Sequence, residues 1–550
     1  MKVLLGYTCH DMGKMEFYSR FTPLGLGTLN AVLRRDGFDS RIVNCSAWTW
    51  PRTKRFLEAE RPDLFGVSVF TFNRHEAMRL AALARAANPR CLIVAGGPHA
   101  THLPRHLLAH YPQVDVVVRG EGEETLLDLA RARARGDLEE SLGSIPGVTW
   151  RTPARGSLAA GFSDTAERPV ILDLDTLPHP SADPATVGVD PTTQFEFIIT
   201  SRGCPAACTF CSSPEFWGRS MRFRSAANMI EEVRLLRDRH GVVYVSVRDD
   251  TFTVSKKRVI DFCRGLIDQK IDLLWDCQSR VNAVDEERLA WMRRAGCTHI
   301  QYGVESGSPR MLQRLNKGIT VDQVRAAAAA TRRVGLGLSI YLITGIESEA
   351  DEDLESTVRL IEEIRPHDGL VSPMTIYPGT ALHEEARARH GLTEDYWVKE
   401  RREAFYVRED PWTRRSIRTL LAALRRVGRR AAYGPEDFAL QRDVVGDCYA
   451  LRLSAGEFWQ RRGALGRARE QYQAILEDNP RSLWARMRLG ALAMRQGRHA
   501  EAAEHYRAAR SVAPAFTLAR RLLATALAAS RARSGASPPG APARSVSPPA

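Results

Sequence analysis

The chain has 550 residues, room for about three or four domains, and its 44% hydrophobic and 26% charged residues are typical of a globular protein with a sizeable core. No apolar stretch reaches the roughly 20 residues of a membrane helix, and the N-terminal apolar run is too short for a signal peptide. Ten cysteines are too dilute for a secreted disulfide scaffold, and the +13 formal charge is concentrated in residues 401–550. We therefore expect a cytoplasmic protein that has no membrane span and does not bind nucleic acid.

Residues 1–140 alternate short apolar runs with amphipathic stretches. The strand patterns are 3–6, 41–44, 64–70, 91–95 and 114–119, and the helical patterns are 24–35, 74–87 and 123–134. This βα alternation predicts an α/β domain with a doubly wound parallel sheet, Rossmann-like, whose ligand lies at the carboxyl ends of the strands. Residues 141–190 are richer in Pro, Gly, Thr and Asp, so we interpret them as a connector.

A second βα series runs through residues 191–385. Its strand patterns are 195–200, 242–247, 273–277, 299–304, 337–344 and 371–377, with helical stretches between them. Six βα units are too few for a complete eight-stranded barrel. They predict an open, partial (β/α)6 barrel of the TIM type.

The last part of the chain is predicted to be helical, with a connector over 386–440 and repeats over 441–530. Gly463, Ala468, Tyr472 and Pro480 recur 34 residues later as Gly497, Ala502, Tyr506 and Pro514. A 34-residue helix–turn–helix period is typical of tetratricopeptide repeats. The Ser-, Pro- and Ala-rich tail, 531–550, is expected to be disordered.

The most specific motif is a cysteine triplet, Cys204, Cys208 and Cys211, on a loop directly after an apolar strand. Three thiolates within eight residues can converge on one soft metal centre. A structural zinc site would need a fourth ligand, and the next cysteine is Cys263. Three thiolates on a [4Fe-4S] cluster would instead leave one iron open to a small chelating molecule. The other seven cysteines are scattered among apolar neighbours and are expected to pack in the core.

The spacing C-x3-C-x2-C, with Phe210 before the third cysteine, resembles that of the radical S-adenosylmethionine (SAM) enzymes over about residues 195–385. The resemblance implies a [4Fe-4S] cluster whose open iron binds SAM, and a 5′-deoxyadenosyl radical that abstracts hydrogen from a substrate. It also implies an electron donor of the flavodoxin or ferredoxin type. By position in the family's segments, the expected SAM contacts are Asp249, Asp250, Arg280, Glu305, Ile340 and Gly345.

The N-terminal domain resembles the cobalamin-binding domain of one radical SAM subfamily. Its glycine-rich loops imply contacts to cobalamin from Gly25, Gly96, Gly97, His99, Gly120 and Gly122. The Asp-x-His-x-x-Gly signature that supplies a histidine to cobalt in other cobalamin proteins is absent, and His75 lacks this pattern. His99 is expected to pack near the cofactor and not to bind cobalt.

These resemblances imply a cobalamin-dependent methyltransferase that acts on an unactivated carbon of a small-molecule, carrier-bound or peptide substrate. One alternative is a radical cyclase or ring-rearranging enzyme in which cobalamin does not methylate. A second is a methylthiotransferase, which would need Cys9, Cys45 and Cys91 as ligands of another cluster, in contexts unlike that family's motifs. A third is a non-catalytic repeat scaffold, although the intact triplet disfavours it. The repeats are expected either to dock a protein partner or to cap the fold.

Overall fold

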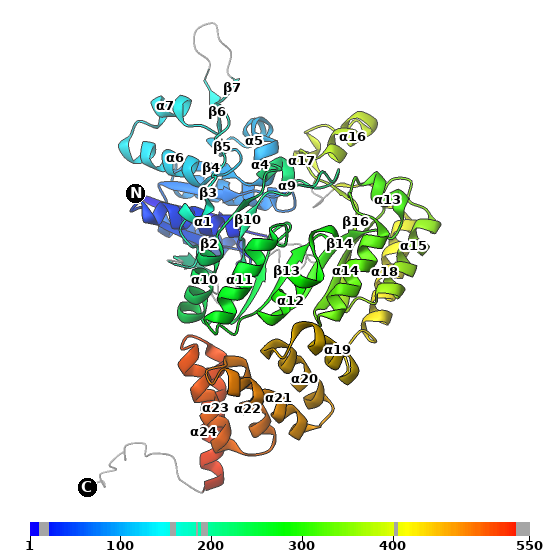
Figure 1. Ribbon diagram of the computed structural model, residues 1–550. Helices are drawn as coiled ribbons and strands as arrows, with labels where there is room; N and C mark the ends of the chain where they lie inside the picture. The colour runs from blue at the N-terminus through cyan, green and yellow to red at the C-terminus, as the bar shows by residue number, and fades with distance from the viewer. Residues whose placement is uncertain (10–20, 154–160, 183–184, 189–195, 401–404, 535–550) are drawn as a thin grey trace, which may run out of the picture.

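The computed structural model describes residues 1–550 except 10–20, 154–160, 183–184, 189–195, 401–404 and 535–550. The chain forms three parts that follow one another in space (Figure 1): an N-terminal α/β domain, a central parallel sheet backed by helices, and a C-terminal helical array. Among the described residues, no helix is long and apolar enough to cross a membrane.

The N-terminal domain is built on a sheet whose strands follow the order β7-β6-β5-β4-β3-β1-β2-β8. Its parallel strands are β1 (Lys2–Tyr7), β2 (Asp39–Asn44), β3 (Leu64–Ser68), β4 (Leu92–Gly96) and β5 (Val116–Val118). One face is covered by α1 (Leu24–Arg35) and α6 (Glu123–Arg135), the other by α2 (Trp50–Glu60), α3 (Arg74–Ala87) and α5 (Pro104–His110). The doubly wound parallel sheet is therefore confirmed.

The expected connector, 141–190, contributes strands to this sheet. β6 (Val148–Thr152) and β7 (Gly161–Asp164) extend it antiparallel beyond β5, and β8 (Thr186–Val187) pairs with β2 at the opposite edge. These strands are short and mostly half-exposed, so they lack the continuous apolar pattern by which the buried parallel strands are recognised. Tertiary pairing, and not local pattern, defines them.

The central sheet has six parallel strands in the order β16-β15-β14-β13-β12-β9. They are β9 (Phe197–Ile198), β12 (Tyr244–Val247), β13 (Leu274–Ser279), β14 (Cys297–Glu305), β15 (Gly337–Thr344) and β16 (Asp368–Pro373). The expected start of the first strand, Phe195, lies outside the described residues. This sheet confirms the predicted partial barrel.

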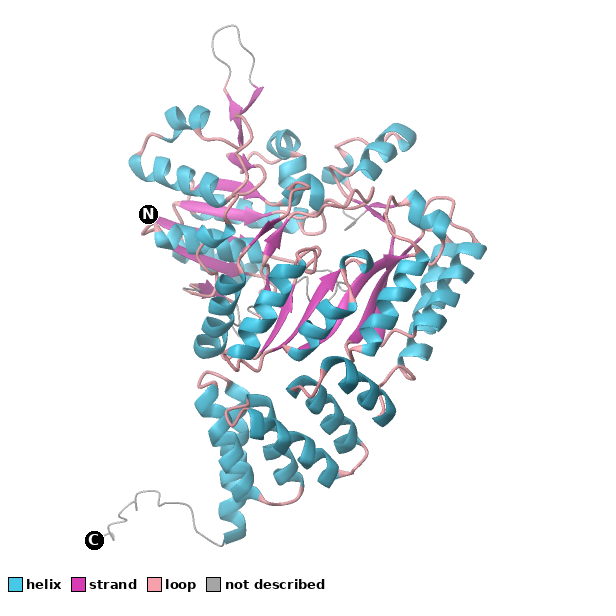
Figure 2. Cartoon of the chain, viewed as in Figure 1, coloured by secondary structure: helices cyan, strands magenta, loops and turns pink. Residues whose placement is uncertain are grey.

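Among the described residues, helices cover the outer face of the central sheet (Figure 2). They are α10 (Ala226–Leu235), α11 (Lys256–Asp268), α12 (Glu286–Arg294), α14 (Val321–Arg333), α15 (Asp351–Ile364) and α18 (Pro411–Gly428). Trp275 anchors the core between sheet and helices, with its ring 5.6 Å from Phe252 and 5.7 Å from Phe262. The opposite, inner face of the sheet borders a cavity.

The C-terminal array consists of helices that pack pairwise. They are α19 (Pro435–Val445), α20 (Tyr449–Arg461), α21 (Leu465–Asp478), α22 (Leu483–Arg495), α23 (His499–Val512) and α24 (Thr517–Ser534). The 34-residue period has a packing reason, because Gly456 and Gly490 leave room for the buried rings of Tyr472 and Tyr506. The helical region is thus confirmed, and α24 continues to residue 534, into the expected tail. Residues 535–550 lie outside the described residues.

We call the central sheet and its covering helices the half-barrel. The array contacts the half-barrel at the amino ends of the strands of its sheet. The hydroxyl of Tyr449 donates to the carbonyl of Leu273, directly before β13, over 2.7 Å. The amide of Asn479 donates to Asp272 over 3.0 Å. The array therefore lies at the opposite end of the sheet from the carboxyl ends of the strands, where parallel α/β folds hold their ligands.

Candidate functional site

The cysteine triplet lies on the loop between β10 (Ser201–Arg202) and α9 (Ser213–Trp217). Cys204 is buried, whereas Cys208 and Cys211 are partly exposed. The backbone N–H of Cys211 donates to the carbonyl of Cys208 over 3.3 Å, which folds the loop on itself. Gly203 begins the loop with φ +96°, and a Cβ there would lie 2.4 Å from the carbonyl oxygen of Ser220. Only glycine can therefore start this turn without displacing the backbone.

Hydrogen bonds with distant segments hold the loop in place. The N–H of Thr209 donates to the carbonyl of Leu315, and the side-chain amide of Asn316 donates to the carbonyl of Ala207 over 2.7 Å. The N–H of Leu382, at the start of α16 (Ala381–His390), donates to the carbonyl of Thr209. The loop is therefore bound to the turn after α13 (Pro309–Arg314) and to the segment beyond β16.

Two of the predicted SAM residues, Arg280 and Glu305, are linked through Lys317 beside the cysteines. The guanidinium of Arg280 lies 3.5 Å from the sulfur of Cys208, and it also donates to the carbonyl of Lys317. The ammonium of Lys317 pairs with Glu305 at 2.6 Å, and both side chains are only 7% exposed. Lys317 also lies 6.0 Å from the ring centre of Phe210. Sequence reasoning missed Lys317; its one signal is a lysine in an Arg-rich chain, within an Asn-Lys-Gly turn.

Backbone geometry aims Glu305 at this cluster. Glu305 has φ +67°, and the register between β14 and β15 shifts between Gly303 and Glu305. A Cβ at Gly303 would lie 2.6 Å from a carboxylate oxygen of Glu305 and 2.8 Å from the ammonium of Lys317. The left-handed conformation costs free energy at a non-glycine residue, and such residues cluster at functional sites. The bulge thus places a buried carboxylate next to the cysteine loop.

The two adjacent aspartates have different surroundings. Asp249 is buried, and its carboxylate accepts hydrogen bonds from the backbone N–H and hydroxyl groups of Thr200 and Ser201. It also pairs with Arg258 at 3.4 Å. Asp250 is exposed and accepts from the hydroxyl of Ser213. Asp249 therefore positions the strand that leads into the cysteine loop, and Asp250 lies beside that loop.

Electrostatics at the third cysteine show how close these groups are. Burial, with smaller contributions from Asp250, Cys208 and Cys204, raises the pKa of the Cys211 thiol to about 12, although a hydrogen bond from the backbone of Ser213 opposes the shift. A thiol in such surroundings stays protonated at neutral pH unless a metal compensates the charge of the thiolate. The sulfurs of Cys204 and Cys208 and the carboxylate of Asp250 therefore all lie within electrostatic range of Cys211.

The remaining predicted SAM residues lie on or after β15. Ile340 is buried in the core between the sheet and its helices. Its neighbours Ser339 and Tyr341 face the inner cavity. Gly345 has φ +76°, and its N–H donates to the buried carboxylate of Glu349 over 2.6 Å. The structure thus separates Ile340 from the cysteine loop and places Gly345 in a tight turn.

A cavity of about 320 Å³ lies at the carboxyl edge of the N-terminal sheet. Five of the six predicted cobalamin residues line it: Gly25, Gly96, Gly97, Gly120 and Gly122. A Cβ on Gly97 would lie 2.9 Å from the carbonyl oxygen of Val69, and one on Gly122 would lie 3.3 Å from Leu29. The other walls are mainly apolar, including Phe70 and Trp217. This glycine-lined apolar slot fits the slender nucleotide tail of a cobalamin.

His99, the sixth residue, does not line this cavity. It is 2% exposed, and its Nδ1 lies 3.2 Å from the hydroxyl of Thr71. Its ring packs edge-on against Trp397 at 5.9 Å. Burial lowers the pKa of His99 well below its usual value, and the neighbouring Arg74 contributes. His99 is thus a neutral packing residue behind the cavity wall.

A second cavity, of about 690 Å³, separates the N-terminal domain from the inner face of the half-barrel. It shares Pro23, Leu24 and Phe70 with the glycine-lined cavity, so the two adjoin. On the half-barrel side, Tyr341 donates to Gln301 over 2.5 Å, Gln278 donates to Tyr341, and Arg248 donates to Gln301. Sequence reasoning missed this network. Polar residues in otherwise apolar strands were its available signal.

A buried cluster of charged side chains joins the N-terminal domain to the half-barrel. It lies next to the cysteine loop and to the glycine-rich loop before α6. Arg202, two residues before Cys204, pairs with Glu121 at 3.3 Å and with Glu123 at 2.5 Å. Arg222 pairs with Glu121 at 2.5 Å. All four side chains are at most 7% exposed. Glu121 and Glu123 also line the glycine-lined cavity, so one ionic cluster contacts the walls of both predicted cofactor sites.

Comparison with known proteins identifies both parts. Residues 198–361 match the radical SAM superfamily, and residues 13–130 match the B12 binding domain. The chain is 32% identical over 381 residues to an uncharacterized methyltransferase, PH0819, of Pyrococcus horikoshii, an alignment that covers 68% of this chain and 81% of the relative. The chain belongs to the cobalamin-dependent radical SAM family. Its cofactors are therefore a [4Fe-4S] cluster, SAM and cobalamin, and the zinc interpretation of the triplet is excluded.

Other relatives of this radical SAM enzyme catalyse more than one kind of reaction. It is 27% identical over 400 residues to the anaerobic magnesium-protoporphyrin IX monomethyl ester cyclase of Rubrivivax gelatinosus, with 70% of each chain covered. It is 28% identical over 387 residues to the hopanoid C-3 methylase of Methylococcus capsulatus, covering 69% of this chain and 72% of the relative. Family membership thus leaves methylation and cyclisation both open.

Solved structures share the fold of this enzyme. The radical SAM methyltransferase TsrM of Kitasatospora setae superimposes with a TM-score of 0.61 at 20% identity, covering 71% of this chain and 76% of that one. The cobalamin-dependent radical enzyme OxsB superimposes with a TM-score of 0.58 at 16% identity, covering 98% and 81%. At these sequence identities, the two similarities establish a shared fold.

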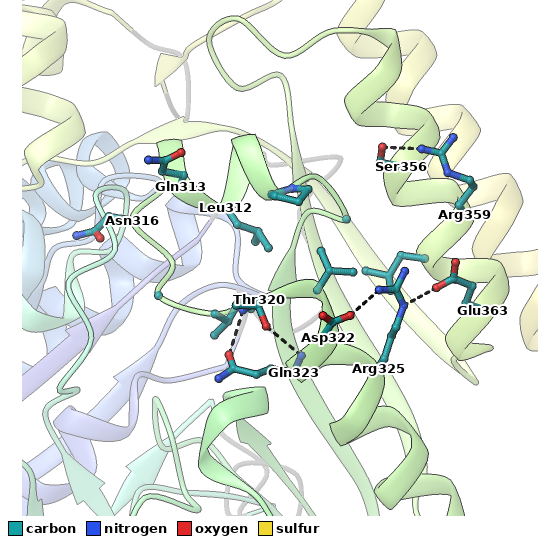
Figure 3. A pocket seen from close by; sticks show the side chains of 16 residues that line it. Leu312, Gln313, Asn316, Thr320, Asp322, Gln323, Arg325, Ser356, Arg359 and Glu363 are labelled. Atoms are coloured by element: carbon teal, nitrogen blue, oxygen red, sulfur yellow. Dashed lines mark hydrogen bonds and ion pairs between the residues drawn. The ribbon is translucent and has the colours of Figure 1, made fainter.

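A larger pocket, of about 800 Å³, opens on the outer helical face of the half-barrel (Figure 3). None of the predicted site residues lines it. Its charged groups pair with one another, since Arg325 binds Asp322 and Glu363, each at 2.8 Å. Arg359 likewise donates to the hydroxyl of Ser356 over 2.8 Å. The predicted site residues thus lie outside this pocket, although Asn316, which lines it, contacts the cysteine loop.

Proposed function

We propose that this enzyme is a methyltransferase that moves a methyl group from methylcobalamin to an unactivated carbon of its substrate. The carrying observation is the junction of the two cavities at Pro23, Leu24 and Phe70. A substrate in the 690 Å³ cavity would face the cobalamin slot on one side and the inner face of the half-barrel on the other. The named methyltransferases among its relatives support the same reaction class.

The residues around the predicted cofactor sites suggest a separate role for each group. Cys204, Cys208 and Cys211 would hold the cluster. Arg280 and Lys317 would offer positive charge to the SAM carboxylate, since a charge-assisted pair is strong where water is excluded. When bound, the cluster and SAM supply the hydrogen-abstracting radical and cobalamin supplies the methyl group; the protein binds, orients and shields them.

The substrate cavity combines polar and apolar walls. Arg248, Gln278 and Gln301 offer hydrogen-bond donors and acceptors on the half-barrel side, and Phe70 and Phe72 line the side of the cobalamin domain. This arrangement suits a molecule that is held by a polar group and presents an apolar carbon toward the cobalamin slot. The aromatic wall would also keep water from the reacting carbon.

A test that needs no known substrate follows from the methyl source. The reduced holoenzyme, incubated anaerobically with SAM deuterated at its methyl group, is expected to form deuterated methylcobalamin and S-adenosylhomocysteine. A metabolite extract is then expected to yield a product with the deuterated methyl group, together with 5′-deoxyadenosine. Formation of 5′-deoxyadenosine without any methylated corrinoid or product would refute methyl transfer.

The same assay distinguishes the cyclase alternative, which the similarity to the magnesium-protoporphyrin cyclase favours. A cyclase would consume SAM to 5′-deoxyadenosine, release no S-adenosylhomocysteine and change its substrate without adding a carbon. A methylthiotransferase would instead need a second cluster. Iron at about eight per chain, without a corrinoid spectrum, would support that assignment.

We further propose that the helical array is a tetratricopeptide-like platform that presents a carrier or peptide-bound substrate. Its 34-residue period and its docking away from the cofactor side leave an Arg-rich surface for a partner. Deletion of residues 465–550 is expected to lower turnover of the carrier-bound substrate more than turnover of the free one. Equal losses would assign the array a supporting role only. The reductant is expected to be a flavodoxin- or ferredoxin-type donor.

A further inference from the structure

A cluster of metal-ligand side chains lies outside the cofactor sites, between α5 and the segment before α17 (Tyr396–Lys399). His106 and His110 are four residues apart on α5, and Glu394 and Asp395 approach from the other segment. The ligand atoms of His106, His110 and Asp395 all lie within 4.8 Å of one another. α5 and the segment before α17 lie near each other in Figure 1, although nearly 300 residues separate them in sequence.

The contacts pair each imidazole with its own carboxylate. Nε2 of His110 lies 3.7 Å from Asp395, and Nδ1 of His106 lies 3.9 Å from Glu394. The two imidazole rings are 4.3 Å apart, centre to centre. The two nitrogen–oxygen separations are longer than hydrogen bonds. They are close to the separation of two ligands on one tetrahedral ion, which is about 3.4 Å when each ligand lies about 2.1 Å from the ion.

The tautomer of His110 is set for metal binding. Its Nδ1 lies 3.0 Å from the carbonyl oxygen of His106, so Nδ1 carries the proton and donates it. In the neutral ring, Nε2 then offers its lone pair toward Asp395. Metal-binding histidines commonly use one ring nitrogen to hold the orientation and the other to bind the ion. Here the helix backbone provides that orienting partner.

We propose that His106, His110 and Asp395 bind a zinc ion, with Glu394 or water as the fourth ligand. Imidazole and carboxylate donors suit zinc, and two histidines at i and i+4 on one helix face present their nitrogens to one ion. The site is distinct from the [4Fe-4S] site, whose ligands are thiolates.

The ion would fasten the chain beyond the half-barrel to the cobalamin domain. Trp397, two residues after Asp395, is 1% exposed, and its carbonyl accepts from Arg74 over 2.6 Å. Its ring packs on His99, behind the cobalamin cavity. The same stretch of chain begins at Leu382, which binds the cysteine loop. A zinc ion bound at Asp395 would therefore fix the segment from Leu382 to Trp397, which contacts both cofactor sites.

The test uses the full chain after reconstitution of its cluster and cobalamin, with ZnCl2 as the probe. After equilibration with zinc and gel filtration, elemental analysis is expected to find about one zinc per chain alongside about four irons. X-ray absorption at the zinc edge should show only nitrogen and oxygen neighbours at about 2.0–2.1 Å. His110→Ala and Asp395→Asn should each weaken zinc binding by at least about tenfold.

A matched control is His505→Ala. His505 also lies next to a carboxylate, with Nε2 3.7 Å from Glu501, but it belongs to no such cluster among the described residues. This variant should retain zinc. Absence of zinc from the wild type, a sulfur neighbour in the absorption spectrum, or undiminished zinc in both variants would overturn the site. Asp395→Asn keeps the shape of its side chain, so its loss of zinc with an unchanged iron count would not reflect misfolding.

Discussion

The charge cluster of Arg202, Glu121, Glu123 and Arg222 leads to a quantitative prediction. The variant Glu121→Gln would leave two buried guanidinium groups with one carboxylate, since Glu121 contacts Arg222 at 2.5 Å and Arg202 at 3.3 Å. Removing one partner of a buried ion pair costs about 3–5 kcal/mol, because the remaining charge stays desolvated. The interface between the two cofactor domains should therefore open far more readily.

Hydrogen exchange measures this opening segment by segment, which suits a protein of several domains. A loss of about 3 kcal/mol corresponds to exchange roughly 100-fold faster, at 1.4 kcal/mol for each factor of ten. The increase is expected in peptides that contain Glu123 and Arg202, whereas the helical array should keep its exchange rates. The assay is run on the reconstituted holoenzyme by mass spectrometry.

A surface pair of the same domain provides the control. Arg105 pairs with Asp164, but its side chain is 61% exposed, and such pairs contribute at most about 1 kcal/mol. Asp164→Asn should therefore change exchange by less than about fivefold. If Glu121→Gln accelerated exchange no more than this control, the cluster would not hold the domains together and the reasoning would fail.

Three further predictions concern the cluster, the cobalamin slot and pH. Cys208→Ala should reduce bound iron from about four per chain to near zero and abolish 5′-deoxyadenosine formation, while corrinoid binding by the N-terminal domain persists. Gly97→Ala should weaken cobalamin binding at least about tenfold, because φ is +98° and a Cβ would lie 2.9 Å from a carbonyl oxygen, whereas Gly143→Ala, with open space around it, should not. Burial lowers the pKa of His367 to about 4, so His367→Gln should remove part of the acid sensitivity of the melting temperature.

The sign of the pH effect follows from which state takes up the proton first. His367 accepts a hydrogen bond from the N–H of Leu338 over 3.0 Å, so it must be neutral in the folded chain. The unfolded chain binds the proton near pH 6.5, and the folded one only near pH 4. The stabilisation is complete above about pH 6.5 and is lost as the pH falls toward 4, by up to about 3 kcal/mol. Equal melting temperatures at pH 7 and pH 5, or the same acid loss in the variant, would contradict this account.

The sequence by itself determined the features that depend on neighbouring residues. Apolar periodicity located the parallel strands and the helices between them, because strands buried on both faces are continuously hydrophobic. The cysteine triplet identified the cluster loop, since its ligands lie within eight residues. Glycines such as Gly97 indicated the slot, because a positive φ and a close backbone approach each require glycine.

Only the tertiary structure determined which of two adjacent residues is buried and which faces a cavity or solvent. Alternation along β15 is visible in the sequence, but only packing directs Ile340 into the core and Ser339 and Tyr341 into the cavity. Asp249 and Asp250 are adjacent in sequence, yet the carboxylate of Asp249 is hydrogen-bonded to Thr200, whereas Asp250 is exposed. A period of two residues gives two faces without saying which one is buried.

Structure alone also brought together groups from distant parts of the chain. Lys317 meets Glu305 because a bulge turns β14, and His110 meets Asp395 because the chain beyond the half-barrel returns to α5. The edge strands of residues 148–164 exist because β5 offers them a partner. Such contacts depend on backbone pairing and on side chains packed across the fold, which local pattern does not encode.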